Sequence, residues 1–370
     1  MQGPSHVASC RRKAPRSCRN PTRVSIVALV AIFCVAAGVI WIAGSYLSKA
    51  TDVFDAHFHL GEALGGLIFL AVSTNLPEIA IVASASVHHD MGLAIGNILG
   101  GIAIQTVVLV LLDVAGMRKK GPLTYEAASL VLVLEALVLI GMLILSITGT
   151  LMPRSLIFLR LTPINVAIAT LWVVGLLLIR TAREEIPWQL KERVAMQGAE
   201  ASASKPGKPQ HITETVIGFI VACVATLAAG VALEETSSML ATRIGLTGVL
   251  FGSTILAAAT SLPEITTGFA SLKLGAYELA MSDIIGGNAF LPVLFVAATL
   301  LSGNPVLPDA KNTDVYLAGL GVLLTMVYAI GLLFRSKRKI FGMGVDSLLV
   351  LVCYTVGLGG LFAVARFSGK

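Results

Sequence analysis

The chain has 370 residues, of which 56% are hydrophobic and only 13% are charged. This composition excludes an ordinary soluble domain and indicates a polytopic membrane protein. The formal net charge of +6 comes from basic residues in the tails and loops, so it informs on membrane orientation and not on nucleic-acid binding.

Residues 1–23 are polar and basic and predict a tail without a packed core. The apolar run that follows is longer than the roughly 7 to 15 residues of a signal-peptide core, so we interpret it as a membrane helix. Each apolar span is near or above the ~20 residues that a helix needs to cross a bilayer. The predicted fold is therefore all-α, with ten transmembrane helices at about 24–47, 60–87, 91–115, 124–147, 162–180, 212–233, 246–272, 277–301, 313–334 and 345–365.

The longest polar stretch between spans, 181–211, predicts a linker between two five-helix units, 24–180 and 212–366. An odd number of helices per unit inserts the two units in opposite orientations, which is the inverted-repeat design with a site at the membrane midplane. The loop lysines and arginines predict an outer N-terminus and a cytoplasmic linker, although the basic tail opposes this assignment.

Two stretches repeat one another at an offset of 186 residues, the difference between Glu264 and Glu78. They run from Gly66 and from Gly252, and both end in Leu-Pro-Glu-Ile. The same offset aligns Asn97 with Asp283, and the pair Gly100-Gly101 with Gly286-Gly287. One such motif would be explained by a kinked helix and a snorkelling glutamate. Two copies in register favour a function.

The repeated residue types supply oxygen ligands at membrane depth. A carboxylate there costs roughly 2.5 to 3.5 kcal/mol, so it normally faces the protein interior or a cavity. Proline removes a backbone donor and leaves the carbonyl four residues earlier without its partner, which in the first copy is that of Ser73. Thr74 shares a helix face with Glu78, as Thr260 does with Glu264. An oxygen-only set of this kind suits a hard cation such as calcium or sodium.

These motifs resemble the paired α-repeats of the cation/calcium exchanger superfamily. Thr260-Ser261-Leu262-Pro263-Glu264 and the segment 283–288 are similar to the second repeat, and Thr74-Asn75-Leu76-Pro77-Glu78 and the segment 96–101 to the first. The motifs cover about a third of the chain, and the helix count extends the likeness over nearly all of it. The resemblance implies an antiporter that moves calcium against sodium or protons, without a cofactor and without enzymatic activity.

Glu78 and Glu264 are the expected central ligands. Two bidentate carboxylates and the carbonyls of Thr74 and Thr260 would supply six oxygens, the low end of the six to eight that calcium takes. The resemblance implies that Asn97 and Asp283 complete neighbouring counter-ion sites. Crowded carboxylates repel one another and favour a bound proton, so sodium and protons both stay open as counter-ions. The complete candidate set is Ser73, Thr74, Asn75, Glu78, Asn97, Thr260, Ser261, Glu264 and Asp283.

The chain also departs from the family pattern. Asn75 replaces the usual serine, and Ile102 replaces an asparagine after the glycine pair. Leu93 and Leu279 stand where prokaryotic sodium-coupled members carry serine. A leucine offers no oxygen to a peripheral sodium ion, so we expect weaker sodium dependence than in typical sodium/calcium exchangers, with protons as the alternative.

Small residues one turn apart, Gly96 with Gly100 and Ser282 with Gly286, predict close helix packing. This packing should bring Asn97 against one Glu-bearing helix and Asp283 against the other. The five cysteines show no metal or disulfide spacing. Polar residues at predicted membrane-face turns are interpreted as solvated, and several acidic residues at span ends or interfaces stay unassigned. The first group is Asp55, His57, His59, Glu62, His88, His89 and Asp90, and the second is Asp113, Glu135, Glu234 and Glu235.

An intramembrane hydrolase and a passive cation channel are the rival functions. An intramembrane hydrolase would need a motif such as His-Glu-x-x-His or Gly-x-Gly-Asp, and the sequence contains neither. A passive cation channel stays open at this stage. The expected partners are calcium, its counter-ion and the lipid bilayer of a plasma (inner) membrane, without nucleic acid, and the sequence does not specify an oligomeric state.

Overall fold

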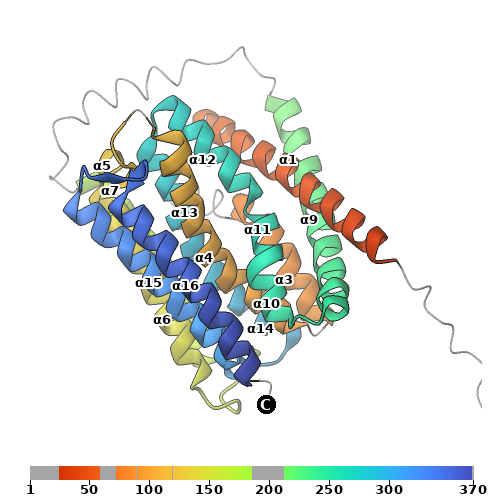
Figure 1. Ribbon diagram of the computed structural model, residues 1–370. Coiled ribbons are helices and arrows are strands. Elements are labelled where there is room, and N and C mark those ends of the chain that lie inside the picture. The colour runs from red at the N-terminus through yellow and green to blue at the C-terminus, as the bar shows by residue number, and fades with distance from the viewer. Residues whose placement is uncertain (1–24, 59–71, 89, 119, 186–211, 369–370) are drawn as a thin grey trace, which may run out of the picture.

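The computed structural model describes residues 25–58, 72–88, 90–118, 120–185 and 212–368, and these are almost entirely helical (Figure 1). The first half contains α1 (Ile26–Phe58), α3 (Leu76–His88), α4 (Met91–Gly116), α5 (Leu123–Glu126), α6 (Leu130–Thr150) and α7 (Pro163–Glu185). The second half contains α9 (Ile212–Ile244), α10 (Gly248–Phe251), the π-helix η2 (Gly252–Leu256), α11 (Ala257–Thr260), α12 (Leu262–Leu274), α13 (Tyr277–Phe290), the 3-10 turns η3 (Leu291–Val293) and η4 (Leu307–Asp309), α14 (Leu294–Ser302), α15 (Asn312–Phe334) and α16 (Val345–Ser368). A small antiparallel hairpin, β1 (Lys339–Ile340) with β2 (Met343–Gly344), joins α15 to α16. The predicted all-α class is confirmed.

Within the described residues, 8 helices are long and apolar enough to cross a membrane. A bent pair, Gly248–Thr260 with Leu262–Leu274, adds a ninth span with a bend of 41°. The predicted span 60–87 is represented by α3, because most of its first half lies outside the described residues. The chain is an integral, multi-pass membrane protein.

Central and peripheral helices differ sharply in burial. In the most apolar part of α4, 72% of the residues are buried in the protein, whereas in that of α16 only 17% are buried. The outward side chains of the peripheral helices are apolar: Val27 and Ile42 in α1 are each 74% exposed, and Val356 in α16 is 69% exposed. Lipid tails are the solvent that such surfaces match.

α1 and α9 lie side by side at one edge of the molecule, and α6, α15 and α16 lie at the opposite edge (Figure 1). The main apolar core lies around α4, α6, α13 and α15. A smaller core holds α1 and α9 against α3 and the α10–α11 segment, with Ile40, Ile81 and Leu233 fully buried in it.

Glycines bring the two halves into backbone contact. A Cβ on Gly96 would lie 2.6 Å from the Val249 carbonyl oxygen, and one on Gly100 would overlap the backbone of Ser253. On the facing segment, a Cβ on Gly252 would lie 3.0 Å from the backbone nitrogen of Asn97. The predicted close packing of α4 is therefore confirmed, and its partner is the α10–η2 segment of the other half.

A second kind of close approach, between a glycine of an edge helix and a proline, occurs at two places in the structure. A Cβ on Gly44 in α1 would lie 2.7 Å from Cγ of Pro263, and a Cβ on Gly230 in α9 would lie 3.1 Å from the carbonyl oxygen of Pro77. Both the glycines and the prolines are related by the 186-residue offset that relates the two Leu-Pro-Glu motifs. Each edge helix thus packs against the proline of the opposite half.

Candidate ion-binding site

The helix breaks directly before both Leu-Pro-Glu motifs. α11 ends at Thr260 and α12 begins at Leu262, and the corresponding turn in the first half is at Asn75. The backbone N–H of Ile79 donates to the Asn75 carbonyl at 3.0 Å, and that of Ile265 donates to the Ser261 carbonyl at 3.3 Å. The predicted proline breaks are confirmed. They place both glutamates in the first turn of a new helix, where the helix dipole favours negative charge.

Both central carboxylates are buried. Glu78 is 1% exposed and Glu264 is 7% exposed. Among the described residues, both carboxylate oxygens of Glu78 and Oε2 of Glu264 lack a hydrogen-bond partner. The ion pairs in that part of the chain are His88–Glu234 and Arg154–Asp309, which leave these two glutamates out. A buried carboxylate without a counter-charge is costly, so a cation or a proton is the expected occupant.

The two halves meet at these carboxylates. The Thr260 hydroxyl of the second half lies beside Glu78 of the first half. This hydroxyl donates to the Ala257 carbonyl at 3.2 Å and makes no hydrogen bond of ordinary geometry with Glu78. The Ser261 hydroxyl donates to the same carbonyl at 2.8 Å. With their hydrogens so engaged, both hydroxyl oxygens keep lone pairs for a cation.

Glu264 lies within electrostatic range of both Glu78 and Asp283. Asp283 is partly buried, and its Oδ2 accepts a hydrogen bond from the Thr267 hydroxyl of α12 at 2.9 Å. Its hydrogen bond thus joins it to the helix of Glu264, and its expected contact with the other Glu-bearing helix stays a prediction. One turn later α13 approaches the first half, where a Cβ on Gly287 would lie 3.8 Å from the Asn75 amide nitrogen.

Two amides complete the polar surroundings. Asn97 is fully buried against η2, and both polar atoms of its side chain lack a partner among the described residues. The predicted approach of Asn97 to the span that carries Glu264 is confirmed. Asn75 donates to the Thr74 hydroxyl at 3.4 Å, and Ser73 is 3% exposed beside them. In the described part of the chain, three acidic, histidine or cysteine side chains do not converge on one metal position. A single ion would therefore draw on Glu78 and Glu264 together with uncharged oxygens.

Leu93 and Leu279, which stand where sodium-coupled family members carry serine, differ in their surroundings. Leu93 is fully buried and packs in the smaller core. Leu279 is 51% exposed. It is not enclosed by protein as Leu93 is, and its effect on a counter-ion site stays a prediction.

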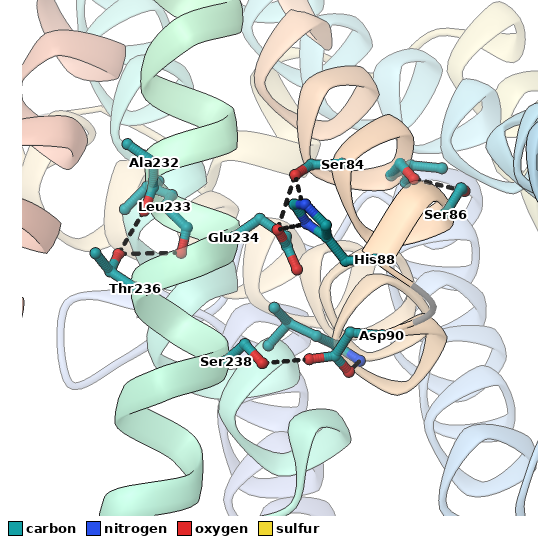
Figure 2. A network of polar contacts seen from close by, with 11 residues as sticks. Ser84, Ser86, His88, Asp90, Ala232, Leu233, Glu234, Thr236 and Ser238 are labelled. Atoms are coloured by element: carbon teal, nitrogen blue, oxygen red, sulfur yellow. Dashed lines mark hydrogen bonds and ion pairs between the residues drawn. The ribbon is translucent and has the colours of Figure 1, made fainter. Parts of the chain in front are cut away.

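The polar residues at the α3–α4 turn are not merely solvated. His88 and Asp90 contact Glu234 and Ser238 of α9 (Figure 2). Sequence reasoning named His88, Asp90 and Glu234 but missed that they form one network, because its two parts are about 150 residues apart in the chain. The side chains of Asp55, His57, His59 and Glu62, and all of His89, lie outside the described residues.

Two other acidic residues stabilise helix packing. Glu135 of α6 accepts a hydrogen bond from Ser282 of α13 at 2.8 Å. Asp113 accepts backbone N–H bonds from Leu123 at 2.8 Å and from Gly344 at 2.7 Å, which fixes the end of α4 to the β-hairpin.

The family model described as "Sodium/calcium exchanger protein" matches residues 28–184 and 214–360. Inner membrane protein YrbG of Escherichia coli is 26% identical over 299 residues, which cover 80% of this chain and 86% of that protein. Among solved structures, the H+/Ca2+ exchanger CAX has a TM-score of 0.64 at 14% identity, covering 91% of this chain and 88% of that one. The sodium-calcium exchanger NCX_Mj has a TM-score of 0.58 at 17% identity, covering 90% and 99%. The two structural matches establish a shared fold.

Proposed function

Because the chain belongs to the sodium/calcium exchanger protein family, we propose that it is a secondary active antiporter that exchanges calcium for sodium or protons across a membrane. The observation that carries the proposal is the pair Glu78 and Glu264. Each is buried, each follows a proline at a helix break, and neither has a counter-charge among the described residues. Calcium would enter this site as the transported substrate, and the protein would need no cofactor.

The proposed ligands are those expected at the two helix breaks. Glu78 and Glu264 would bind calcium through their carboxylates, and Thr74 and Thr260 through their backbone carbonyls. Ser73, Asn75 and Ser261 would line the same pocket. Asn97 and Asp283 would serve the counter-ion, because Asn97 is an unpartnered amide and Asp283 lies within range of Glu264.

The proposed topology is ten spans in two inverted five-helix repeats, 24–180 and 212–366, after a basic tail, 1–23, and around a cytoplasmic linker, 181–211. The bent α10–α12 span supports it, and α3 would be the second half of the matching span in the first repeat. The contact between Gly44 and Pro263 and the contact between Gly230 and Pro77 are related by the same 186-residue offset, which further supports the two repeats. We place the protein in the plasma membrane, as the name of the Escherichia coli relative suggests.

The test is calcium uptake by liposomes that contain the purified protein. Uptake is measured against an imposed sodium gradient at clamped pH, and then against a pH gradient without sodium. An antiporter moves calcium only when an opposing ion gradient is present, and the active gradient identifies the counter-ion. Calcium flux that continues without any opposing ion would instead identify a channel and refute the proposal.

A further inference from the structure

A buried carboxylate outside the ion site joins the two repeats. Glu234 of α9 is 1% exposed, and its Oε2 accepts a hydrogen bond from the Ser84 hydroxyl at 2.8 Å. The same oxygen lies 3.2 Å from Nδ1 of His88, whose side chain is 49% exposed (Figure 2). Ser84 and His88 belong to the last turns of α3, the helix that begins next to Glu78.

A second contact, one turn further along α9, fastens this helix to the turn between α3 and α4. The Ser238 hydroxyl of α9 donates to Oδ2 of Asp90 at 2.6 Å. Asp90 is also the N-cap of α4, where its Oδ1 accepts the backbone N–H of Leu93 at 3.4 Å. α9 is therefore held to the end of α3 and to the start of α4 (Figure 2).

Helix geometry separates this network from the ion site. Successive residues of an α-helix turn by about 100°, so Ser84, six residues after Glu78, lies about 240° around α3. Pro77, Ala80 and Ser84 share one stripe with His88, and Gly230 and Glu234 of α9 contact that stripe. Glu78 points to another face. Glu234 therefore acts on the position of α3 and does not bind the ion that Glu78 binds.

Packing alone does not require a carboxylate at this interface. The equivalent interface, between α1 and α12, has the same close approach of glycine to proline, Gly44 to Pro263. At the 186-residue offset, Glu234 corresponds to Ser48, Ser84 to Ala270 and His88 to Leu274. The α1–α12 interface has a different polar contact, in which Trp41 Nε1 donates to the Thr266 hydroxyl at 2.6 Å. The two interfaces thus share the glycine–proline approach, and the buried carboxylate of Glu234 is an addition to one of them.

We propose that Glu234 is a positioning residue for transport, which holds α3 against α9 so that the carboxylate of Glu78 stays in the ion site. The inference rests on the proposed function. The turn at Asn75 interrupts the helix before α3, so contacts with neighbouring helices such as α9 help to determine where the first turn of α3 lies. Removing the Glu234 contacts would let α3 shift and would weaken calcium binding without removing a ligand.

The experiment measures initial rates of calcium uptake in liposomes over a range of calcium concentrations. Glu234→Gln, His88→Gln and the double variant are compared with Thr236→Val, a control on the same helix whose hydroxyl donates to the carbonyl of Ala232 in its own helix at 2.6 Å. The triple variant Ser84→Ala, His88→Leu, Glu234→Ser gives this interface the residues of its counterpart. Melting of the purified proteins reports on folding.

We expect Glu234→Gln to raise the half-saturating calcium concentration about five- to tenfold, the factor that corresponds to the net contribution of a typical hydrogen bond, about 1 to 1.4 kcal/mol, with a near-normal maximal rate per folded protein. The double variant should have the same half-saturating calcium concentration as the stronger single variant, because both substitutions break the same contact, the one between Glu234 and His88. If Glu234→Gln does not fold, His88→Gln and the triple variant decide the same comparison.

Half-saturating concentrations equal to those of Thr236→Val, with or without a lower melting temperature, would overturn the inference and leave Glu234 a purely structural residue. Glu78→Gln, which should abolish calcium exchange, is the negative control, and the unsubstituted protein is the positive control. Together they distinguish a failure of the proposed function from a failure of the inference about Glu234. An unsubstituted protein that moves no calcium refutes the proposed function and the inference with it. Normal transport that does not respond to Glu234 substitutions refutes the inference alone.

Discussion

Replacing Gly100 by alanine should separate the two repeats. The new Cβ would overlap the backbone of Ser253 and lie 2.7 Å from its carbonyl oxygen, and a backbone cannot give way as a side-chain end can. Overpacking of this kind costs about 1 to 3 kcal/mol. Alanine in a helix interior recovers about 0.5 to 1 kcal/mol relative to glycine, so the net loss is up to about 2.5 kcal/mol. We expect a lower melting temperature in detergent and reduced calcium exchange, because the same contact seats Asn97.

The adjacent glycine is a matched control. A Cβ on Gly101 would lie 3.8 Å from Cδ1 of Leu291, an ordinary contact with the end of a flexible side chain. Gly101→Ala should therefore melt at the same temperature as the unsubstituted protein or higher, and should transport normally. Equal melting temperatures for Gly100→Ala and Gly101→Ala would show that the α4–η2 contact is looser than described, and would refute the reasoning.

The other predictions concern individual side chains. Glu78→Gln and Glu264→Gln should each abolish calcium exchange in liposomes while yields and melting stay near normal, because an amide cannot replace the charge that offsets calcium desolvation; near-normal uptake would exclude that residue as a ligand. Asp283→Asn should retain part of the calcium binding and lose coupling to the counter-ion, and an unchanged exchange stoichiometry would contradict this. Leu279→Ser should leave the sodium dependence of calcium efflux unchanged, because the side chain is half exposed and not enclosed in a site; a steeper dependence would place it at an ion site.

The sequence predicted the helix breaks and the two buried glutamates because their causes are local. Proline ends the hydrogen-bonding pattern wherever it falls, and a glutamate in an apolar run must face inward. The span ends were less predictable. α9 was expected to end near 233, where apolarity falls, yet it continues to Ile244. Its polar residues stay helical because they find partners, Glu234 in Ser84 and Thr236 in its own backbone.

Contacts between distant segments were beyond prediction from one sequence. Nothing near Glu234 in the chain indicates that its partner is Ser84, and hydropathy treats the α3–α4 turn as an ordinary solvated loop. The different exposure of Leu93 and Leu279 was unpredictable for a related reason. The resemblance gives a residue's place along a helix, whereas its exposure depends on how the neighbouring segments cover that face.

Departures from the internal symmetry are informative because the symmetry itself is so regular. In α4 the small residues are pressed against the backbone of the other repeat, but in α13 the corresponding Ser282 and Gly286 face the carboxylate of Glu135. At the edge, Glu234 reinforces one glycine–proline interface and not the other. Two identical inverted halves would be exchanged by the inversion that relates them, so neither side of the membrane would be favoured. Glu135 lies in the first half and Glu234 in the second, so each departure adds a buried carboxylate to a different half, and the polar contacts of the two halves are not equivalent.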